Sequence, residues 1–213
     1  MVFGELLEIV GEEPVFETGL LLAGAVDPQD VRRQLSRWTG AGRLYQLRRG
    51  LYALAPPFRK GKPHPFLVAN RLVLGSYVSL QSALAYYGLI PEAVPVTTSV
   101  TPDRPGRWDT PLGTYEFRHL QADLLTGYRW LEMTDGQFAY VASPGKALLD
   151  LIHLEPEADS SRYLEGLRLQ HLEMLDRDEL RHMAALAGKP KLKRAAERIV
   201  ELAERESEEY ETL

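Results

Sequence analysis

The sequence contains no cysteine, and this absence excludes several kinds of chemistry at once. Disulfides, thiolate zinc sites, iron–sulfur clusters and cysteine nucleophiles all require that residue. No apolar run approaches the roughly 20 residues that a bilayer-spanning helix needs. The first residues, MVFGELLEIVGEE, also lack the basic segment of a signal peptide. We therefore expect a cytoplasmic protein without a membrane partner.

Acidic residues are missing from one long stretch. The net charge is -5, yet no Asp or Glu occurs between Val31 and Pro91. The basic residues of this stretch are Arg32, Arg33, Arg37, Arg43, Arg48, Arg49, Arg59, Lys60, Lys62 and Arg71. A local field of one sign on an acidic protein predicts a surface for a polyanion. The alternative is a basic face that the acidic side chains of residues 1–30 neutralise.

The first 40 residues show the patterns of three helices. Apolar residues at helical spacing predict a helix over residues 2–11 and a shorter one within residues 15–23. Asp27 followed by Pro28 is a strong helix start, because the carboxylate accepts from exposed N–H groups and proline suits the first helical position. In this third helix Val31, Leu35 and Trp38 form the inward face.

A hairpin follows the third helix. The β-type runs LYQL (44–47) and LYAL (51–54) are joined by Arg48-Arg49-Gly50, which fits a three-residue loop with Gly50 in the left-handed conformation. Helix, short helix, helix and hairpin is the order of a winged helix-turn-helix, whose third helix enters a major groove. The basic residues between Val31 and Ala55 are all arginines, and arginine is the side chain that suits bidentate recognition of phosphate or guanine. The expected DNA-binding residues are Gln29, Arg32, Arg33, Ser36, Arg37, Arg43, Arg48 and Arg49.

The remaining residues predict a second unit. Four prolines make residues 56–65 a plausible linker, and helices are expected over 66–74 and 80–87. Short β-rich runs within 96–142 predict a small antiparallel sheet. Further helices are expected from Ser143-Pro144 onward, over about 160–169, 176–187 and 190–208. We therefore predict an α+β protein, with a winged helix-turn-helix domain at 1–60 and a C-terminal α+β domain at 61–213.

Motifs for catalysis are weak. The five histidines show no metal-ligand spacing, and Gly145-Lys146 lacks the rest of a phosphate-binding loop. We expect no catalytic residues, no metal and no cofactor. Four carboxylates could in principle gather into a nuclease site, and these are Asp103, Asp109, Glu116 and Asp150.

Several segments carry a resemblance to a known family. They are RLYQLRRGLYALAP, YVSLQSALAYYGLIPE (77–92), TSVT (98–101), GTYEFRHL, SPGKALLDLIHL (143–154) and YLEGLRL (163–169). Their order and spacing resemble those of the AbiEi-type antitoxins, predicted transcriptional regulators of viral defence. Gln81 and Gly145 depart from that pattern, where acidic residues are frequent. In both motifs the apolar faces and serine-led helix starts favour structural packing over direct function.

The resemblance implies an antitoxin that represses its own operon. A winged N-terminal domain would bind promoter repeats in double-stranded DNA, and a C-terminal domain would counteract a co-encoded nucleotidyltransferase-like toxin, with or without direct contact. It places DNA binding on the arginines already selected. Two alternatives remain: a nuclease that uses the winged helix for targeting, and a regulator whose C-terminal domain senses a small molecule.

Overall fold

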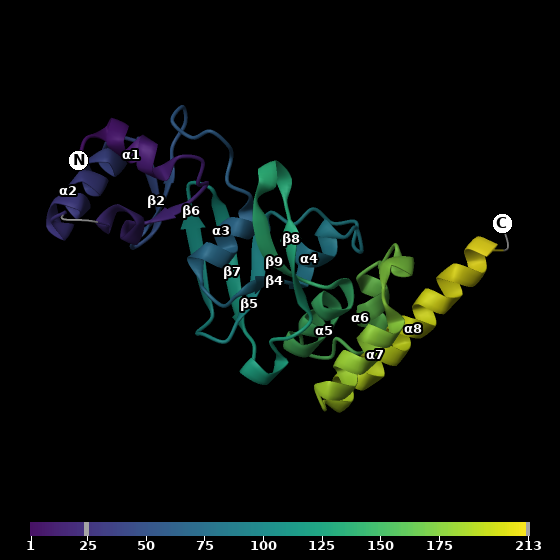
Figure 1. Ribbon diagram of the computed structural model, residues 1–213. Coiled ribbons are helices and arrows are strands. Elements are labelled where there is room, and N and C mark those ends of the chain that lie inside the picture. The colour runs from purple at the N-terminus through teal and green to yellow at the C-terminus, as the bar shows by residue number, and fades with distance from the viewer. Residues whose placement is uncertain (24–25, 212–213) are drawn as a thin grey trace.

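The computed structural model describes residues 1–23 and 26–211, with side chains described to residue 206. Figure 1 shows three parts in a row: a small N-terminal part, a central sheet, and a group of helices at the other end. The chain is an α+β protein, as predicted, and the described residues form eight α-helices and two sheets. None of the described helices is both long and apolar enough to span a bilayer.

The N-terminal part combines helices with a three-stranded antiparallel sheet of order β1-β3-β2. Its elements are α1 (Phe3–Val10), β1 (Phe16–Glu17), the 3-10 helix η1 (Thr18–Leu22), α2 (Pro28–Gly40), β2 (Leu44–Arg48) and β3 (Leu51–Leu54). The helix predicted within residues 15–23 is therefore wrong in its first part. Phe16 pairs with Tyr52 of β3 and is 1% exposed, so burial in the sheet overrides the helical spacing of Phe16 and Leu20.

The central sheet has six strands in the order β6-β7-β5-β4-β9-β8. They are β4 (Tyr77–Val78), β5 (Val96–Thr101), β6 (Gly106–Thr110), β7 (Gly113–His119), β8 (Tyr128–Glu132) and β9 (Phe138–Ala142). The expected small antiparallel sheet is thus larger and mixed, because β5 pairs in parallel with β7 and β4 pairs in parallel with β9. β4 is only two residues long and lies at the centre.

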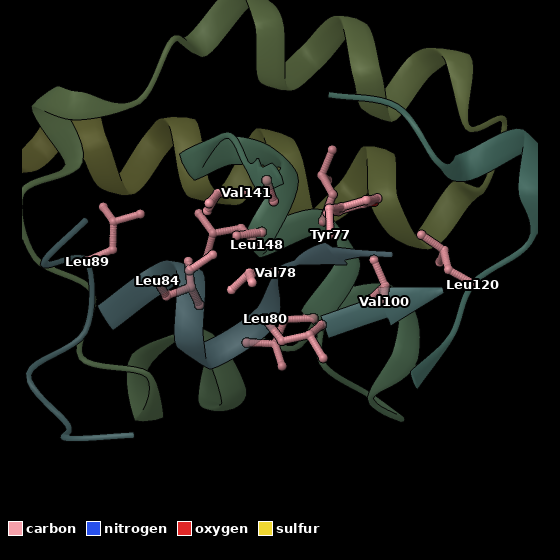
Figure 2. Packing of buried hydrophobic residues seen from close by; sticks show 14 of the residues in the cluster. Tyr77, Val78, Leu80, Leu84, Leu89, Val100, Leu120, Val141 and Leu148 are labelled. Atoms are coloured by element: carbon pink, nitrogen blue, oxygen red, sulfur yellow. The ribbon is translucent and has the colours of Figure 1, made fainter. Parts of the chain in front are cut away.

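Helices surround and extend this sheet. They are α3 (Pro65–Leu72), α4 (Leu80–Tyr86), α5 (Pro144–Leu154), α6 (Ser161–Gly166), α7 (Arg177–Leu186) and α8 (Pro190–Glu211). Figure 2 shows the packing of Tyr77, Val78 and Val141 from the strands with Leu84 of α4 and Leu148 of α5. α5 begins where the sequence predicts, because the Ser143 hydroxyl accepts from the Lys146 amide and Pro144 needs no partner for its nitrogen.

Two clusters of buried apolar residues correspond to the two sheets. The smaller cluster lies within residues 6–54 and includes Leu6, Leu35 and Trp38. The opposite face of the three-stranded sheet joins the large cluster through Leu47, Leu51 and Ala53, among others. The segment 56–65 is also held, since the side-chain amide of Gln137 bonds to the backbone of Lys62 and His64. The division at residue 60 remains a prediction.

Candidate nucleic-acid interface

Helix α2 is fixed at its start and along one face. The Asp27 carboxylate accepts a hydrogen bond of 2.8 Å from the Gln29 amide, which satisfies one of the free N–H groups of the first turn. Val31, Leu35 and Trp38 are at most 3% exposed. The Trp38 ring also meets Phe3 of α1 edge to face, with ring centroids 5.3 Å apart. The helix is therefore anchored on one side, as the sequence predicts.

The opposite face of α2 is open to solvent. It carries the exposed residues Gln29, Arg32, Arg33, Ser36 and Arg37, together with the exposed Asp30. Arg33 contacts Asp30 one turn earlier, and the Arg37 guanidinium donates to the Gln34 side chain. The Arg33–Asp30 pair is largely exposed, and such pairs contribute little free energy, so this guanidinium can exchange its partner for a phosphate or a base at small cost. Figure 1 shows α2 at the outer end of the N-terminal part, away from the central sheet.

Arg43 lies just beyond α2 and is exposed. Its guanidinium carbon stands 5.0 Å from the centroid of the Phe3 ring. This cation–π contact orients the side chain without consuming its N–H donors. Arg43 can therefore donate to an anion beside the C-terminal end of α2.

The hairpin between β2 and β3 is tighter than predicted. Arg48 belongs to β2 and pairs opposite Leu51 after a register shift, which leaves Arg49 and Gly50 as the connection. Gly50 has φ of +82°, the left-handed conformation expected of it. The expected three-residue loop is wrong by one residue, because the β-bulge extends the strand.

The two arginines of the β2–β3 hairpin consequently differ. Arg49 is exposed at the turn, whereas the Arg48 side chain is 29% exposed and turns toward the central part. The Arg48 guanidinium donates to the carbonyl oxygen of Arg71 at 3.3 Å and lies 3.5 Å from a Glu17 carboxylate oxygen. Arg48 thus bridges the hairpin and α3, which makes it less available to an external ligand than Arg49.

Acidic side chains within residues 1–30 form ion pairs with part of the basic stretch. The ion pairs are Asp30–Arg33, Glu17–Arg48 and Glu12–Lys60. In each of them the acidic side chain is at least 44% exposed, so solvent screens the attraction. The alternative of a neutralised basic face therefore describes three of the ten basic residues, and only weakly.

The four carboxylates considered for a nuclease do not come together. Asp109 on β6 accepts a 2.7 Å hydrogen bond from the Thr114 hydroxyl, while Asp150 is buried on α5. Across residues 1–23 and 26–206, whose side chains the structure describes, no group of three or more His, Asp and Glu has the geometry to hold a metal ion.

A buried ionic cluster in the central part escaped the sequence reasoning. Lys146 and Asp150 form an ion pair one turn apart on α5, with side chains 6% and 2% exposed. The second Asp150 oxygen accepts from Tyr77 at 3.0 Å and from Ser79 at 2.7 Å. Burial raises the pKa of the Asp150 carboxyl, and the Lys146 ammonium opposes that shift. A Lys and an Asp four apart inside the apolar run KALLDLI were the available signal.

A row of exposed aromatic residues was also missed. Tyr128 and Trp130 on β8 and Phe138 and Tyr140 on β9 share one face of the hairpin that ends the sheet. Each of these side chains is at least 36% exposed. Their alternation with Arg129, Leu131, Ala139 and Val141 was the sequence signal, since alternate residues of a strand share a face.

Comparison with known proteins gives a fold and no activity. No protein-family model and no curated protein matches the chain. Among solved structures, the chain is similar to the crystal structure of the Rv2827c protein from Mycobacterium tuberculosis. The TM-score is 0.53 and the identity 17%, over 94% of this chain and 76% of the mycobacterial chain. At this identity, the likeness concerns the fold alone.

Proposed function

We propose that the chain is a DNA-binding transcriptional repressor and the antitoxin of a toxin–antitoxin operon. The N-terminal part is a winged helix-turn-helix in this proposal, with α2 as the recognition helix and the β2–β3 hairpin as the wing. The protein itself is not an enzyme and takes no cofactor. Its partners are repeats in its own promoter and a co-encoded nucleotidyltransferase-like toxin.

One observation supports the DNA-binding part above all others. Helix α2 buries Val31, Leu35 and Trp38 to 3% exposure or less, while it presents Arg33 and Arg37 to solvent at the end of the molecule. A rigid helix with exposed arginines is the element that reads base edges in a major groove. The antitoxin part is supported by the sequence resemblance to AbiEi-type proteins.

Binding to the promoter tests this proposal. The full-length protein should prefer a duplex from its own promoter over random duplex between 50 and 200 mM salt, with log K falling against log salt at a slope of about -5 for roughly six phosphate contacts. Arg33→Ala and Arg37→Ala should each cost about 1–3 kcal/mol on the promoter and less on random DNA. Arg49→Ala should weaken both alike, because a wing tip contacts the backbone.

Two exposed arginines outside the interface provide the matched control. Arg104→Ala and Arg162→Ala, made singly, each remove the same charge from exposed positions outside α2 and the hairpin and should leave the promoter preference unchanged. Equal affinity of the wild type for promoter and random DNA would reject the proposal. A loss in the control as large as in the α2 variants would mean that only overall charge matters.

A further inference from the structure

The aromatic row described above forms one wall of a groove. The opposite wall consists of Leu67, Asn70 and Arg71 of α3, together with Leu74 in the turn that follows this helix. The cavity holds about 430 Å³. Leu74 is 63% exposed and Trp130 is 54% exposed, so the groove opens a sizeable apolar surface to solvent. An exposed patch of this kind marks a binding site more often than chance.

The groove is held in shape by hydrogen bonds to the backbone. The Asn70 side-chain oxygen accepts from the Tyr140 amide at 2.6 Å, and the Asn70 amide donates to the carbonyl of Ser76 at 3.3 Å. Asn70 therefore continues the sheet hydrogen bonding along β9 where the two-residue β4 ends. This ties α3 to the aromatic hairpin and fixes the width of the groove before any ligand arrives.

The aromatic rings form a continuous surface. Trp130 lies nearly parallel to Phe138, with centroids 5.6 Å apart, and its centroid is 4.4 Å from that of Tyr140. Tyr128 meets Tyr140 edge to face and stacks at 4.7 Å on the buried Tyr77. The rings support one another, so their outer faces and edges are presented without a large loss of side-chain freedom on binding.

The electrostatic character of the groove favours an anion. Among the described residues that line it, none is Asp or Glu, whereas Arg71 lies on its wall. The Nε atom of Arg71 is buried and has no hydrogen-bond partner. Since protein atoms cover this nitrogen, a phosphate in the groove would be held by the terminal nitrogens of the guanidinium. The groove also adjoins the basic stretch, because Arg48 of the wing donates to the Arg71 carbonyl.

We propose that this groove between α3 and the β8–β9 hairpin binds single-stranded nucleic acid, with bases stacked on Trp130 and Tyr140 and a phosphate held by Arg71. Proteins bind single strands without sequence preference by stacking bases on exposed aromatic side chains beside a positively charged groove, and here Arg71 supplies the charge. A protein partner would also suit the aromatic surface, but it would not require an arginine in a groove whose described lining residues include no carboxylate. This site is separate from the promoter interface on α2 and does not depend on it.

Titration of the full-length protein with labelled single strands tests the proposal. Oligo(dT) and oligo(rU) of about 12 nucleotides fall within the site sizes of such grooves. We expect binding of at least one of them, with quenching of Trp130 fluorescence. Trp130→Leu and Tyr140→Leu keep apolar bulk at exposed positions and should each weaken binding about tenfold. Arg71→Gln should weaken it and flatten its salt dependence. A preference for oligo(dT) or for oligo(rU) identifies DNA or RNA as the ligand.

Two controls separate this site from the promoter interface. Tyr86→Leu removes another exposed tyrosine, 45% exposed on α4 and outside the groove, and should leave single-strand binding unchanged. The double variant Arg33→Ala with Arg37→Ala should keep single-strand binding while it loses promoter duplex. The proposal is overturned if neither oligonucleotide binds, or if Trp130→Leu and Tyr140→Leu bind as the wild type does. It is equally overturned if these variants abolish self-association in sedimentation and leave single-strand binding intact.

Discussion

At the residue scale, the most consequential contact is the buried pair of Lys146 and Asp150. Asp150 accepts from Lys146, Tyr77 and Ser79, so both of its oxygens have partners although the side chain is 2% exposed. Lys146→Met removes the compensating charge and should lower the free energy of unfolding by about 3–5 kcal/mol at pH 7. Urea unfolding followed by circular dichroism measures this change.

The pH dependence of this loss of stability tests whether the uncompensated charge of Asp150 causes it. Burial raises the pKa of the Asp150 carboxyl in the folded protein above 3.8, so the folded state binds the proton more readily than the unfolded state. Stability from this group is present at low pH and lost as pH rises through the raised pKa. Without the Lys146 ammonium, which opposes the shift, the Asp150 pKa should rise further. The loss of unfolding free energy caused by Lys146→Met should therefore be smaller at pH 5, where Asp150 is more readily protonated, than at pH 8. Adding Asp150→Asn, which keeps an acceptor for Tyr77 and Ser79, should recover most of the loss at pH 8. A deficit that is independent of pH and of Asp150→Asn would contradict the electrostatic account.

At the scale of the element, the start of α2 carries a prediction of its own. The Asp27 carboxylate caps the helix through the Gln29 amide, and both residues are exposed. Asp27→Ala should lower the free energy of unfolding by about 1 kcal/mol, whereas Asp27→Asn retains an accepting oxygen and should cost far less. Equal losses for both variants would show that the charge, and not the cap, stabilises the helix.

Helix starts are where the sequence predicts the structure best. Asp27, Ser143 and Asp176 each accept from a first-turn amide at the beginning of an expected helix. These signals are local, since a short polar side chain and the next three residues determine the geometry. The burial of the inward face of α2 follows from the same local periodicity.

Strand partners could not be predicted in the same way. The two-residue strands at Phe16 and Tyr77 are too short for an alternating pattern, and their conformation is set by the distant strands β3 and β5. Parallel pairing of β5 with β7 depends on the course of the chain through β6, which no single run reveals. The sequence did not predict the hydrogen-bond partners of Asp150 or the aromatic groove for the same reason. Residues from distant strands and from α3 form both sites.

At the scale of the whole molecule, the proposed activities lie on different parts of the chain. The exposed arginines of α2 are at one end in Figure 1. Of the segments that resemble antitoxins, RLYQLRRGLYALAP forms the β2–β3 hairpin, whereas residues 77–92 and 143–154 form β4, α4 and α5 in the central part. The three-stranded sheet shares Leu47, Leu51 and Ala53 with the large core. Deleting either part would expose this contact, so point variants separate the activities more cleanly than truncation.

The central claim is that repression depends on α2 while protection from the toxin depends on the residues beyond 60. Its most direct test is co-expression of the adjacent toxin, from an independent promoter, with the double variant Arg33→Ala and Arg37→Ala at protein levels matched to the wild type. We expect this variant to lose repression of a promoter reporter and still to protect cells as well as the wild type does. Protection no better than that of an empty vector would contradict it.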